Sequence, residues 1–410
     1  MTDYADEPAL PYGRHLVEDD DVAAVVAALK SGWLTTGPAV QAFEAALASR
    51  VGAAHAVSCS SGTAALHLTA LALGLGPGDR VIVPTLTFLA TANAVRYVGA
   101  EVVFADVDPE TGLMGDAQLR DALARAADGT VKAVFPVHMA GQCGSMERIA
   151  AVAADRGLRV VEDACHAIGS TYEDGRGEWI PVGSCRHSNM TVFSFHPVKT
   201  VTMGEGGAVT TNDQEMSRRL AQLRNHGMER DASAFEQIDL AFDREGKADP
   251  WYYELKELGY NYRASDINCA LGMSQLGKLD RFVEGRRALV AHYDARVASL
   301  APIVRPIGRV AGCQTAWHLY TVLIDFKAAG VDRATVMRRL QEKGIGTQVH
   351  YLPVHMQPYY RRRYGDRRLP GAETYYGRAL SLPLFPAMEG YDVERVVEAL
   401  GRGLGLGDAS

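Results

Sequence analysis

Several polar residues in this sequence stand where an apolar run ends, which is where α/β proteins expose reactive groups. The first such group is Ser60-Ser61-Gly62-Thr63, a turn of small residues that opens directly into the helical pattern of residues 64–66. Unsatisfied backbone N–H groups at a helix start, together with hydroxyl groups, favour the binding of a phosphate. An ordinary serine N-cap explains the same residues without a ligand, so this turn alone does not establish a site.

An acidic residue ends the apolar run that begins at Val160. Ligands of parallel α/β sheets bind at the carboxyl ends of strands, so Asp163 stands where a cofactor nitrogen or a metal ion would be met. Asp163, Cys165 and His166 could together ligate a metal, but three ligands packed on one strand end give poor coordination geometry. We therefore expect no metal site.

A lysine follows a later apolar run, residues 191–195, which is broken by Pro197. An amine that is desolvated at this position has a depressed pKa and is nucleophilic enough to form a Schiff base. Most lysines are solvated at the surface instead. The glycine-rich segment 204–207 precedes another apolar run and allows close backbone approach, which favours the chemical role of Lys199.

Together these three groups match the demands of pyridoxal phosphate. Its phosphate needs N–H groups and hydroxyls, its pyridine nitrogen needs a carboxylate, and its aldehyde needs an amine. Phe88, at the end of the apolar segment 81–88, is a candidate to stack on the pyridine face. A fourth segment, residues 259–263, is polar and aromatic, and is equally explained as a capped helix start with packed tyrosines.

The elements that must position these groups alternate along the chain between about residues 50 and 215. Short β-branched runs follow alanine-rich stretches of helical periodicity, which predicts an α/β fold with a mostly parallel sheet. The expected strands are residues 80–83, 101–106, 132–137, 159–162, 190–195 and 207–211. The expected helices are residues 63–73, 90–98, 116–127 and 145–155.

The pattern changes in the last part of the chain. Residues 229–257 are rich in charge and predict a long surface excursion, and residues 265–300 predict one long helix. A strand at 321–326 and helices at 332–343 and 392–400 follow. We therefore expect a large domain at residues 1–275, and a connecting helix with a small C-terminal α/β domain at residues 276–410.

The composition excludes several other classes of protein. The chain has 410 residues, of which 47% are hydrophobic and 22% are charged, as in globular proteins. Its net charge of -7 predicts no binding to nucleic acid or to an anionic membrane. No run approaches the roughly 18 uncharged apolar residues of a membrane span. The acidic first seven residues do not resemble a secretory signal, and the six cysteines without a CxxC pair predict reduced thiols in a cytoplasmic protein.

Six motifs, in this order, resemble those of the DegT/DnrJ/StrS nucleotide-sugar aminotransferases. They are SGTAAL at 61–66, TFLAT at 87–91, EDACHA at 162–167, FSFHPVK at 193–199, GEGG at 204–207 and GYNYR at 259–263. The resemblance extends from residue 34 to residue 351. It implies a fold-type I pyridoxal phosphate enzyme, similar to aspartate aminotransferase, that forms a homodimer with active sites at the subunit interface.

The resemblance also implies roles for residues in five of these motifs. Lys199 holds the cofactor and then moves a proton between the substrate carbon and the cofactor, and Asp163 pairs with the pyridine nitrogen. His166, where many relatives carry glutamine, faces the phenolic oxygen of the cofactor. Phe88 stacks on the ring. The phosphate is held by Gly62, Thr63 and Ser194, and by Asn261 from the other subunit.

Within the family, residues 195–199, 258–263 and 344–351 look most like the PseC-type enzymes of pseudaminic acid biosynthesis. That resemblance implies amination of C4 of a UDP-linked 4-keto-6-deoxy-N-acetylhexosamine, with L-glutamate as the amino donor. The ArnB-like and dTDP-sugar aminotransferases share most of the motifs and are the alternative. Thr35, Thr36, His350 and Tyr351 are candidates to bind the substrate. The arginines of residues 361–368 are either a solvated turn or a grip on the nucleotide diphosphate.

A protein of a different class fits some of the same motifs. A non-catalytic regulator that binds pyridoxal phosphate keeps the scaffold, but such proteins usually carry an added DNA-binding domain. No basic helix-turn-helix pattern precedes residue 50. The presence of Lys199 also disfavours the dehydratases of the family, which replace this lysine with histidine.

Overall fold

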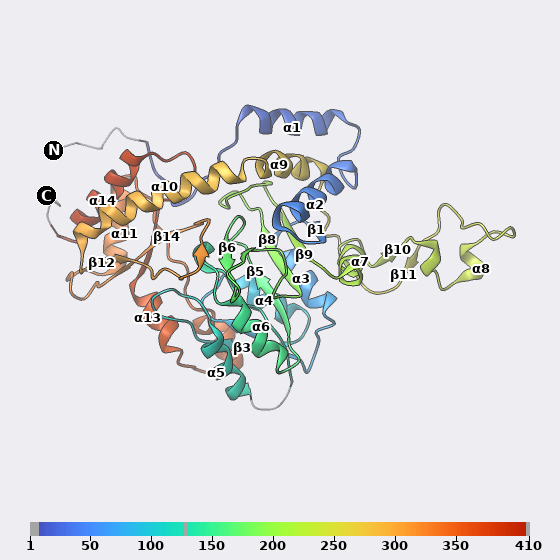
Figure 1. Cartoon of the computed structure of the whole chain (residues 1–410), viewed down its shortest axis with the longest axis horizontal. Coiled ribbons are helices and arrows are strands. Elements are labelled where there is room, and N and C mark those ends of the chain that lie inside the picture. The colour runs from blue at the N-terminus through green and yellow to red at the C-terminus, as the bar shows by residue number, and fades with distance from the viewer. Residues whose placement is uncertain (1–7, 127–129, 407–410) are drawn as a thin grey trace.

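The computed structural model describes residues 8–126 and 130–406. The acidic segment of residues 1–7 and residue 127, the expected end of a helix, lie outside the described residues. Figure 1 shows a central α/β body, a long helix that leads from it to the C-terminal elements, and an arm that projects from the opposite side.

A seven-stranded sheet forms the centre of the body, in the order β1-β9-β8-β5-β4-β2-β3. The strands are β1 (His55–Cys59), β2 (Arg80–Pro84), β3 (Glu101–Ala105), β4 (Val131–Val134), β5 (Arg159–Asp163), β8 (Met190–Ser194) and β9 (Gly207–Thr211). Every neighbouring pair is parallel except those made by β9, which runs antiparallel to β8 and β1. The predicted α/β fold with a mostly parallel sheet is therefore confirmed. Strand β1 was not expected, because His55 and Ser58 interrupt its apolar pattern.

Helices cover both faces of this sheet, as the near-continuous apolar strands require. They are α2 (Pro38–Val51), α3 (Gly62–Ala72), α4 (Leu89–Tyr97), α5 (Asp116–Ala126), α6 (Met146–Ala154) and α7 (Gln214–Leu223). Within β2, Val81 and Val83 pack into one hydrophobic cluster and Ile82 into a second one. Successive side chains of a strand point to opposite faces of the sheet. The two clusters are therefore the hydrophobic cores on the two faces.

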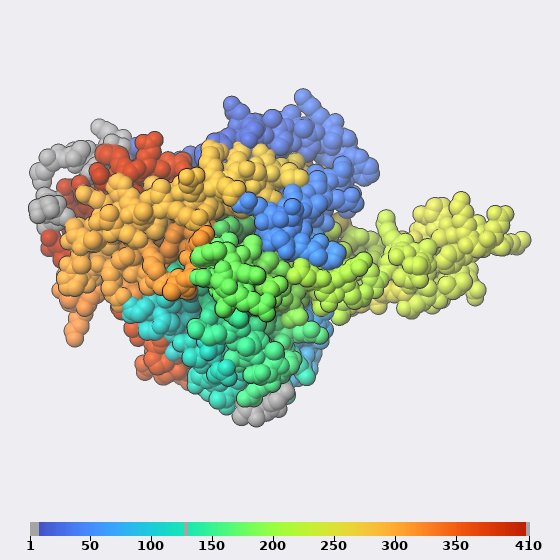
Figure 2. All heavy atoms as spheres, in the orientation of Figure 1, coloured from blue at the N-terminus to red at the C-terminus, as the bar shows by residue number. Residues whose placement is uncertain are grey.

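The charge-rich segment after α7 forms the predicted surface excursion. Strands β10 (Met228–Glu229) and β11 (Glu254–Leu255) pair, and α8 (Ile238–Ala241) lies between them. Figures 1 and 2 show that this arm projects away from the body of the molecule. It carries large apolar side chains at its surface, among them Trp251, which is 73% exposed.

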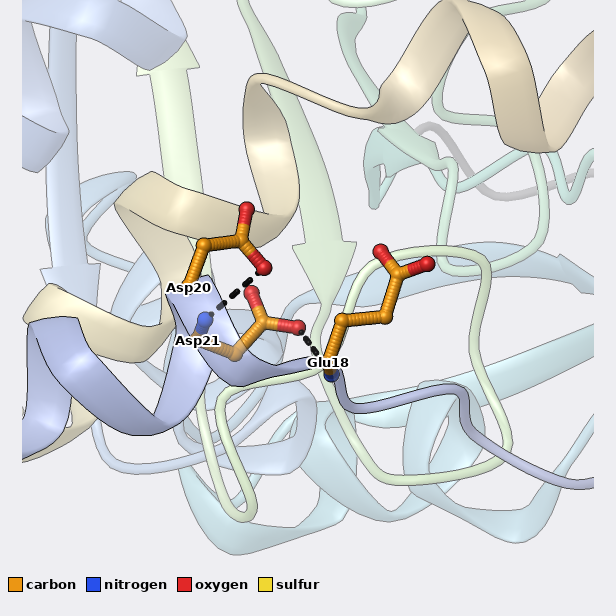
Figure 3. A group of neighbouring side chains, drawn as sticks. All are labelled: Glu18, Asp20 and Asp21. Carbon is orange, nitrogen blue, oxygen red and sulfur yellow. Dashed lines mark hydrogen bonds between the residues drawn. The ribbon is translucent and has the colours of Figure 1, made fainter.

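The expected single helix over residues 265–300 is divided into α9 (Asp266–Leu276) and α10 (Leu279–Val297). The break falls at Gly277 and Lys278. The ammonium of Lys278 lies within 3.1 Å of carboxylate oxygens of Glu18, Asp20 and Asp21, at the start of α1 (Asp19–Lys30). These three acids, which Figure 3 shows side by side, are close enough together to suggest a metal site. Their pairing with Lys278 gives them an ionic partner from the protein itself.

The elements after α10 include an antiparallel sheet of β12 (Val304–Pro306), β14 (Tyr320–Ile324) and β15 (Ala379–Leu382). Helices α11 (Arg333–Glu342), α12 (Pro358–Tyr364), α13 (Pro370–Arg378) and α14 (Gly390–Gly403) accompany it. The short strand β13 (Cys313–Gln314) pairs instead with the hairpin of β6 (Thr171–Glu173) and β7 (Trp179–Pro181). The division at residues 275 and 276 stays a prediction. No helix of the described residues is both long and apolar enough to cross a membrane.

Candidate active site

A cavity of about 460 Å³ opens at the carboxyl ends of β5 and β8. Strand β5 ends at Asp163 and β8 ends at Ser194, and the turn after β8 brings Lys199 to the same cavity. The predicted residues that line it are Gly62, Thr63, Phe88, Asp163, His166, Ser194, Lys199, His350 and Tyr351. The carboxylate of Asp163 and the amine of Lys199, which were expected to carry the chemistry, thus line the same cavity.

One end of the cavity is the start of α3. The side chain of Ser61 accepts a hydrogen bond of 3.1 Å from the N–H of Ala64, which confirms the serine N-cap. Gly62 and Thr63 are the first two helical residues, so their N–H groups have no partner within the helix. The N-cap interpretation and the phosphate interpretation are therefore compatible, because capping uses one donor and leaves others available.

Close backbone packing shapes this end of the cavity. A Cβ atom on Gly62 would lie 2.8 Å from the Cβ of Ser194, and one on Gly207 would lie 2.4 Å from the carbonyl carbon of Ser61. Neither position tolerates a larger residue without a shift of the backbone. The glycines thus bring α3, β8 and β9 close enough for Ser194 to face the helix start, which makes a cradle of suitable size for a phosphate.

Asp163 is held from two sides and is only 5% exposed. Its Oδ2 accepts a hydrogen bond of 2.7 Å from the hydroxyl of Thr91, and its Oδ1 accepts one of 3.2 Å from the N–H of Cys165. The hydroxyl of Thr91 also lies 2.8 Å from the hydroxyl of Thr87. Thr91 was not predicted as a site residue, although the spacing of two threonines four residues apart at the start of a helix indicates a shared face.

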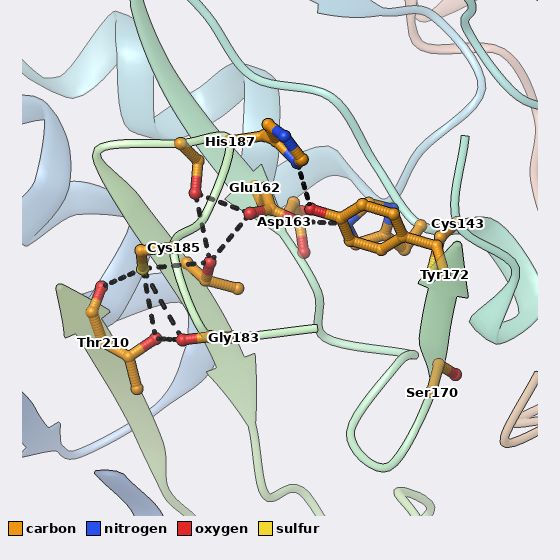
Figure 4. A network of polar contacts seen from close by, with 12 residues as sticks. Cys143, Glu162, Asp163, Ser170, Tyr172, Gly183, Cys185, His187 and Thr210 are labelled. Carbon is orange, nitrogen blue, oxygen red and sulfur yellow. Dashed lines mark hydrogen bonds and ion pairs between the residues drawn. The ribbon is translucent and has the colours of Figure 1, made fainter. Parts of the chain in front are cut away.

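A second buried acid lies directly beside Asp163 on β5. Figure 4 shows Glu162 within a polar network. It accepts hydrogen bonds from Ser188 at 2.5 Å and from Thr191 at 3.1 Å, and its Oε2 lies 2.7 Å from Nε2 of His138. Burial alone would raise the pKa of Glu162, but these partners, His138 first, outweigh it and lower the pKa. Because the backbone N–H of His138 also donates to the carbonyl of Asp163 at 3.0 Å, this network fixes the strand end that presents the Asp163 carboxylate.

Lys199 follows a turn in which its N–H donates to the carbonyl of His196 at 2.8 Å. The residue lines the cavity and is partly buried. Burial lowers the pKa of Lys199, against the opposing influence of Cys165 and Asp163. A lowered pKa increases the fraction of neutral amine, which is the nucleophilic form.

His166 lies deep in the cavity, beside Tyr351 and His318. Its Nε2 is 3.2 Å from the hydroxyl of Tyr351, and its ring centroid is 4.4 Å from that of His318. Burial, followed by the charge of Lys199, holds the pKa of His166 well below its usual value, so the ring is neutral. Its Nδ1 has no hydrogen-bond partner in the part of the chain that the structure describes. A buried ring nitrogen without a partner fits a site that a polar ligand completes.

Two further predicted residues lie on the C-terminal side of the cavity. The Nδ1 of His350 is 2.9 Å from the hydroxyl of Ser381, and burial lowers the pKa of His350 to about 3. The ring of Tyr351 lies 5.9 Å from that of Phe88, which is 57% exposed. Sequence reasoning missed His318, and also Tyr12, whose ring lies 5.5 Å from that of His350.

The remaining candidates lie outside this cavity. Asn261 is exposed and forms a β-bridge with Asn225. Thr36 lines a separate hollow of about 160 Å³ together with Arg224, Asn225 and Arg263, and its neighbour Thr35 forms a bridge with Ser265. A single chain therefore does not bring Asn261, Thr35 or Thr36 to the other site residues.

The arginines of residues 361–368 also lie elsewhere. None of them lines the cavity. Arg362, Arg363 and Arg367 line a different groove, at the amino ends of β2 and β3. These arginines therefore do not line the cavity of their own chain, and a grip on the substrate diphosphate stays a prediction.

A mostly parallel sheet that presents an aspartate and a lysine at its strand ends, opposite a helix start, defines the class of pyridoxal phosphate-dependent transferases. Comparison with protein families extends this result, since the model of the DegT/DnrJ/EryC1/StrS aminotransferase family matches residues 16–401. The chain belongs to this family, and the resemblance read from the six motifs is confirmed.

Individual relatives cover nearly the whole chain. The spore coat polysaccharide biosynthesis protein SpsC of Bacillus subtilis is 40% identical over 394 residues, which span 95% of this chain and 96% of that protein. Helicobacter pylori PseC, an aminotransferase involved in the biosynthesis of pseudoaminic acid, superposes with a TM-score of 0.85 at 28% identity and covers 97% of this chain and 100% of its own. The putative sugar aminotransferase Spr1654 of Streptococcus pneumoniae, in its PLP-form, gives a TM-score of 0.84 at 27% identity. The match covers 97% of this chain and 99% of that protein's chain.

These findings confirm the predicted cofactor, pyridoxal phosphate. The residues of the cavity fit it. The start of α3 with Ser194 suits the phosphate, Asp163 suits the pyridine nitrogen, and Lys199 suits the aldehyde. When bound, this cofactor supplies an electron sink that stabilises negative charge on the carbon that loses or gains a proton.

Proposed function

We propose that the protein transfers the amino group of L-glutamate to C4 of a UDP-linked 4-keto-6-deoxy-N-acetylhexosamine. The observation that carries this proposal is the superposition on Helicobacter pylori PseC over 97% of the chain, combined with a cavity in which Asp163 and Lys199 meet. The similarity to SpsC, which acts in spore coat polysaccharide biosynthesis, supports a sugar substrate. The alternative is another nucleotide-linked keto sugar, such as a dTDP-sugar or the substrate of an ArnB-like enzyme.

Four cavity residues have roles in this reaction. The carboxylate of Asp163 holds a proton on the pyridine nitrogen, and its hydrogen bond from Thr91 keeps it oriented. The Nζ of Lys199 first binds the cofactor and then carries a proton to and from the substrate carbon, as its lowered pKa favours. Phe88 covers one face of the cofactor ring. The neutral His166 faces the phenolic oxygen and can share a hydrogen bond there through its unpartnered Nδ1.

The site is completed by a second copy of the chain. Asn261 lies at the surface, outside the cavity of its own chain, and so do Thr35 and Thr36. The arm of residues 229–257 supports an interface, because it exposes large apolar side chains such as Leu240, Trp251 and Leu255. In the homodimer, Asn261 reaches the phosphate in the partner's cavity, and Thr35 and Thr36 contact the substrate.

The cellular context is a further part of the proposal. All six cysteines are free, which supports a reducing compartment and hence the cytoplasm. A large domain of residues 1–275 and a small C-terminal domain of residues 276–410 enclose the cavity between them. His350 and Tyr351, which contact the substrate, come from the second of these domains.

The assay that tests this function offers L-glutamate and a panel of UDP- and dTDP-linked 4-keto sugars to the holoenzyme and follows the mass of the product. We expect amination of the UDP-linked N-acetyl sugar in preference to the others. Turnover restricted to dTDP sugars would overturn the assignment of the nucleotide. Absence of turnover on any sugar, in a protein that binds the cofactor, would favour the non-catalytic regulator.

A further inference from the structure

A second large groove lies at the amino ends of the strands, on the side of the sheet opposite to the active-site cavity. The groove has a volume of about 710 Å³ and is lined by Arg80 and Glu101, the first residues of β2 and β3. These strands run parallel to β5, whose last residue, Asp163, faces the active-site cavity. A strand of five residues spans roughly 16 Å at about 3.3 Å per residue, so the groove is separate from the cavity.

The groove is strongly basic, although the protein as a whole is acidic. Among the residues that the structure describes, its lining contains five arginines and one carboxylate, that of Glu101. The arginines are Arg80, Arg125, Arg362, Arg363 and Arg367. The groove therefore has an excess of positive charge within a chain of net charge -7. Such a local reversal of sign attracts anions.

The carboxylate of Glu101 is already neutralised. Both oxygens of Glu101 accept hydrogen bonds from the guanidinium of Arg363, the hydroxyl of Tyr364 donates to it at 2.7 Å, and Arg96 lies 2.9 Å away. The hydrogen bonds from Arg363 are the main reason that the pKa of Glu101 falls to about 2. Glu101 is therefore paired within the groove and does not offset the charge of Arg362 and Arg367.

The arginines of residues 361–368 divide according to their position. Arg361 and Arg368 do not line the groove, and each has a carboxylate partner, Asp366 at 2.6 Å and Glu373 at 2.8 Å. Arg362 and Arg367 do line it, and neither has a carboxylate within salt-bridge distance among the residues that the structure describes. Arg362 and Arg367 thus face the groove without an acidic partner, while Arg363 faces it paired with Glu101.

Like charges also meet inside the groove. Arg125 is anchored through a hydrogen bond of 2.9 Å to the carbonyl of Phe104, and it pairs with Asp121. Burial first, and then the positive charge of Arg367, lower the pKa of Arg125. A ligand with two negative groups placed between these arginines would relieve the repulsion and accept several charge-assisted hydrogen bonds.

We propose that this groove binds a ligand that carries a diphosphate. The guanidinium groups of Arg362 and Arg367 come from different segments, the helix α12 and the turn after it, and each can bind one phosphate through two parallel hydrogen bonds. The diphosphate belongs either to a nucleotide or to inorganic pyrophosphate. Tyr359, which also lines the groove and is 48% exposed, provides a ring on which a nucleobase can stack.

Calorimetric titration of the holoenzyme with UDP and, separately, with inorganic pyrophosphate tests the proposal. The double variant Arg362→Gln/Arg367→Gln should weaken pyrophosphate binding by at least about tenfold, since it removes charge-assisted hydrogen bonds to both phosphates. The matched control is Arg361→Gln/Arg368→Gln, which removes the same net charge from outside the groove and should change the affinity by less than about twofold. The KM for the keto sugar should stay unchanged in both variants, because neither pair lines the active-site cavity.

The outcomes separate the possibilities. Absence of saturable pyrophosphate and UDP binding in the parent protein overturns the proposal, and so does an equal loss of affinity in the two double variants. Tighter binding of UDP than of pyrophosphate, with the advantage lost in Tyr359→Leu, identifies a nucleotide as the source of the diphosphate. Equal binding of the two probes identifies the inorganic ligand. Because binding is measured without turnover, these results do not depend on the proposed transamination.

Discussion

The hydroxyl of Thr91 donates a hydrogen bond of 2.7 Å to Oδ2 of Asp163, across 72 positions of the sequence. The bond joins the first turn of α4 to the carboxyl end of β5. It orients the carboxylate that we propose to serve the pyridine nitrogen, and we therefore propose Thr91 as a positioning residue for the reaction.

The variant Thr91→Val replaces this hydroxyl by a methyl group of similar size. We expect kcat to fall by about tenfold or more, because the loss of a hydrogen bond to a buried carboxylate costs about 1–3 kcal/mol. Thr91→Ser keeps the hydroxyl and should retain most of the activity. Steady-state kinetics and the dissociation constant of the cofactor measure the effect. A Thr91→Val enzyme with the kinetics of the parent and a lowered melting temperature would indicate a structural role only.

Lys199→Ala should abolish transamination and leave the fold intact. The change removes the amine that we propose to bind the cofactor and to move the proton, a contribution of roughly 10²–10⁴-fold for the proton transfer alone. Borohydride reduction followed by mass spectrometry should find the cofactor attached to the parent chain and absent from the variant. Turnover within an order of magnitude of the parent would remove Lys199 from its role.

The parts of the site that the sequence reveals are those built from contiguous segments. Asp163 and Lys199 each stand at or within a few residues of the end of an apolar run. The same short segment therefore predicts both the end of a strand and the reactive side chain there. Thr91 and His318 could not be found in this way. Each reaches the site from a segment remote from its partner, and such contacts are fixed by tertiary packing and not by local pattern.

Two other features could not be predicted from local sequence pattern, namely the break between α9 and α10 and the positions of the arginines of residues 361–368. Helical periodicity continues through Gly277, so the sequence predicts one helix where the structure has α9 and α10. The break coincides with ion pairs from Lys278 to three acids near α1, more than 250 positions away in sequence. The charge of residues 361–368 can be read from the sequence, but only the structure shows that Arg361 and Arg368 pair with acids outside the groove while Arg362 and Arg367 face it.

Asp163→Asn should bind pyridoxal phosphate less tightly and turn over far more slowly. A neutral amide cannot hold the proton on the pyridine nitrogen, while its oxygen can still accept the hydrogen bond from Thr91. The fold should therefore be preserved, and circular dichroism provides that control. An unchanged steady-state rate would contradict the assigned role.

Glu110 links β12 to α13 and should make stability sensitive to acid. Hydrogen bonds from Arg305, and then from Arg378, lower the pKa of Glu110 to about 2. Since the folded pKa lies below the unfolded value of about 4.3, this stabilisation is complete above that value and is lost as the pH falls toward 2. Glu110→Gln should lower the urea midpoint at pH 6 and show a smaller further loss between pH 5 and pH 3 than the parent does. Arg305→Gln should reproduce the same change, and equal acid sensitivity in all three proteins would refute the linkage.

Asn261 provides a test of the interface. It is exposed and does not line the cavity of its own chain, so its proposed contact with the cofactor phosphate requires a second subunit. Lys199→Ala and Asn261→Ala homodimers should each be nearly inactive. After subunit exchange, a hybrid dimer has one site that contains both intact Lys199 and the partner's intact Asn261, so activity should return to part of the parent value.

The hybrid experiment also separates this role from that of a helix-start residue. If Asn261 only stabilises the segment before α9, Asn261→Ala should lower the melting temperature and keep the affinity for pyridoxal phosphate. Native mass spectrometry must first demonstrate the mixed dimer. A demonstrated mixed dimer without recovered activity would exclude Asn261 from the site, whereas recovery in proportion to the fraction of hybrid would place it in the active site of the neighbouring subunit.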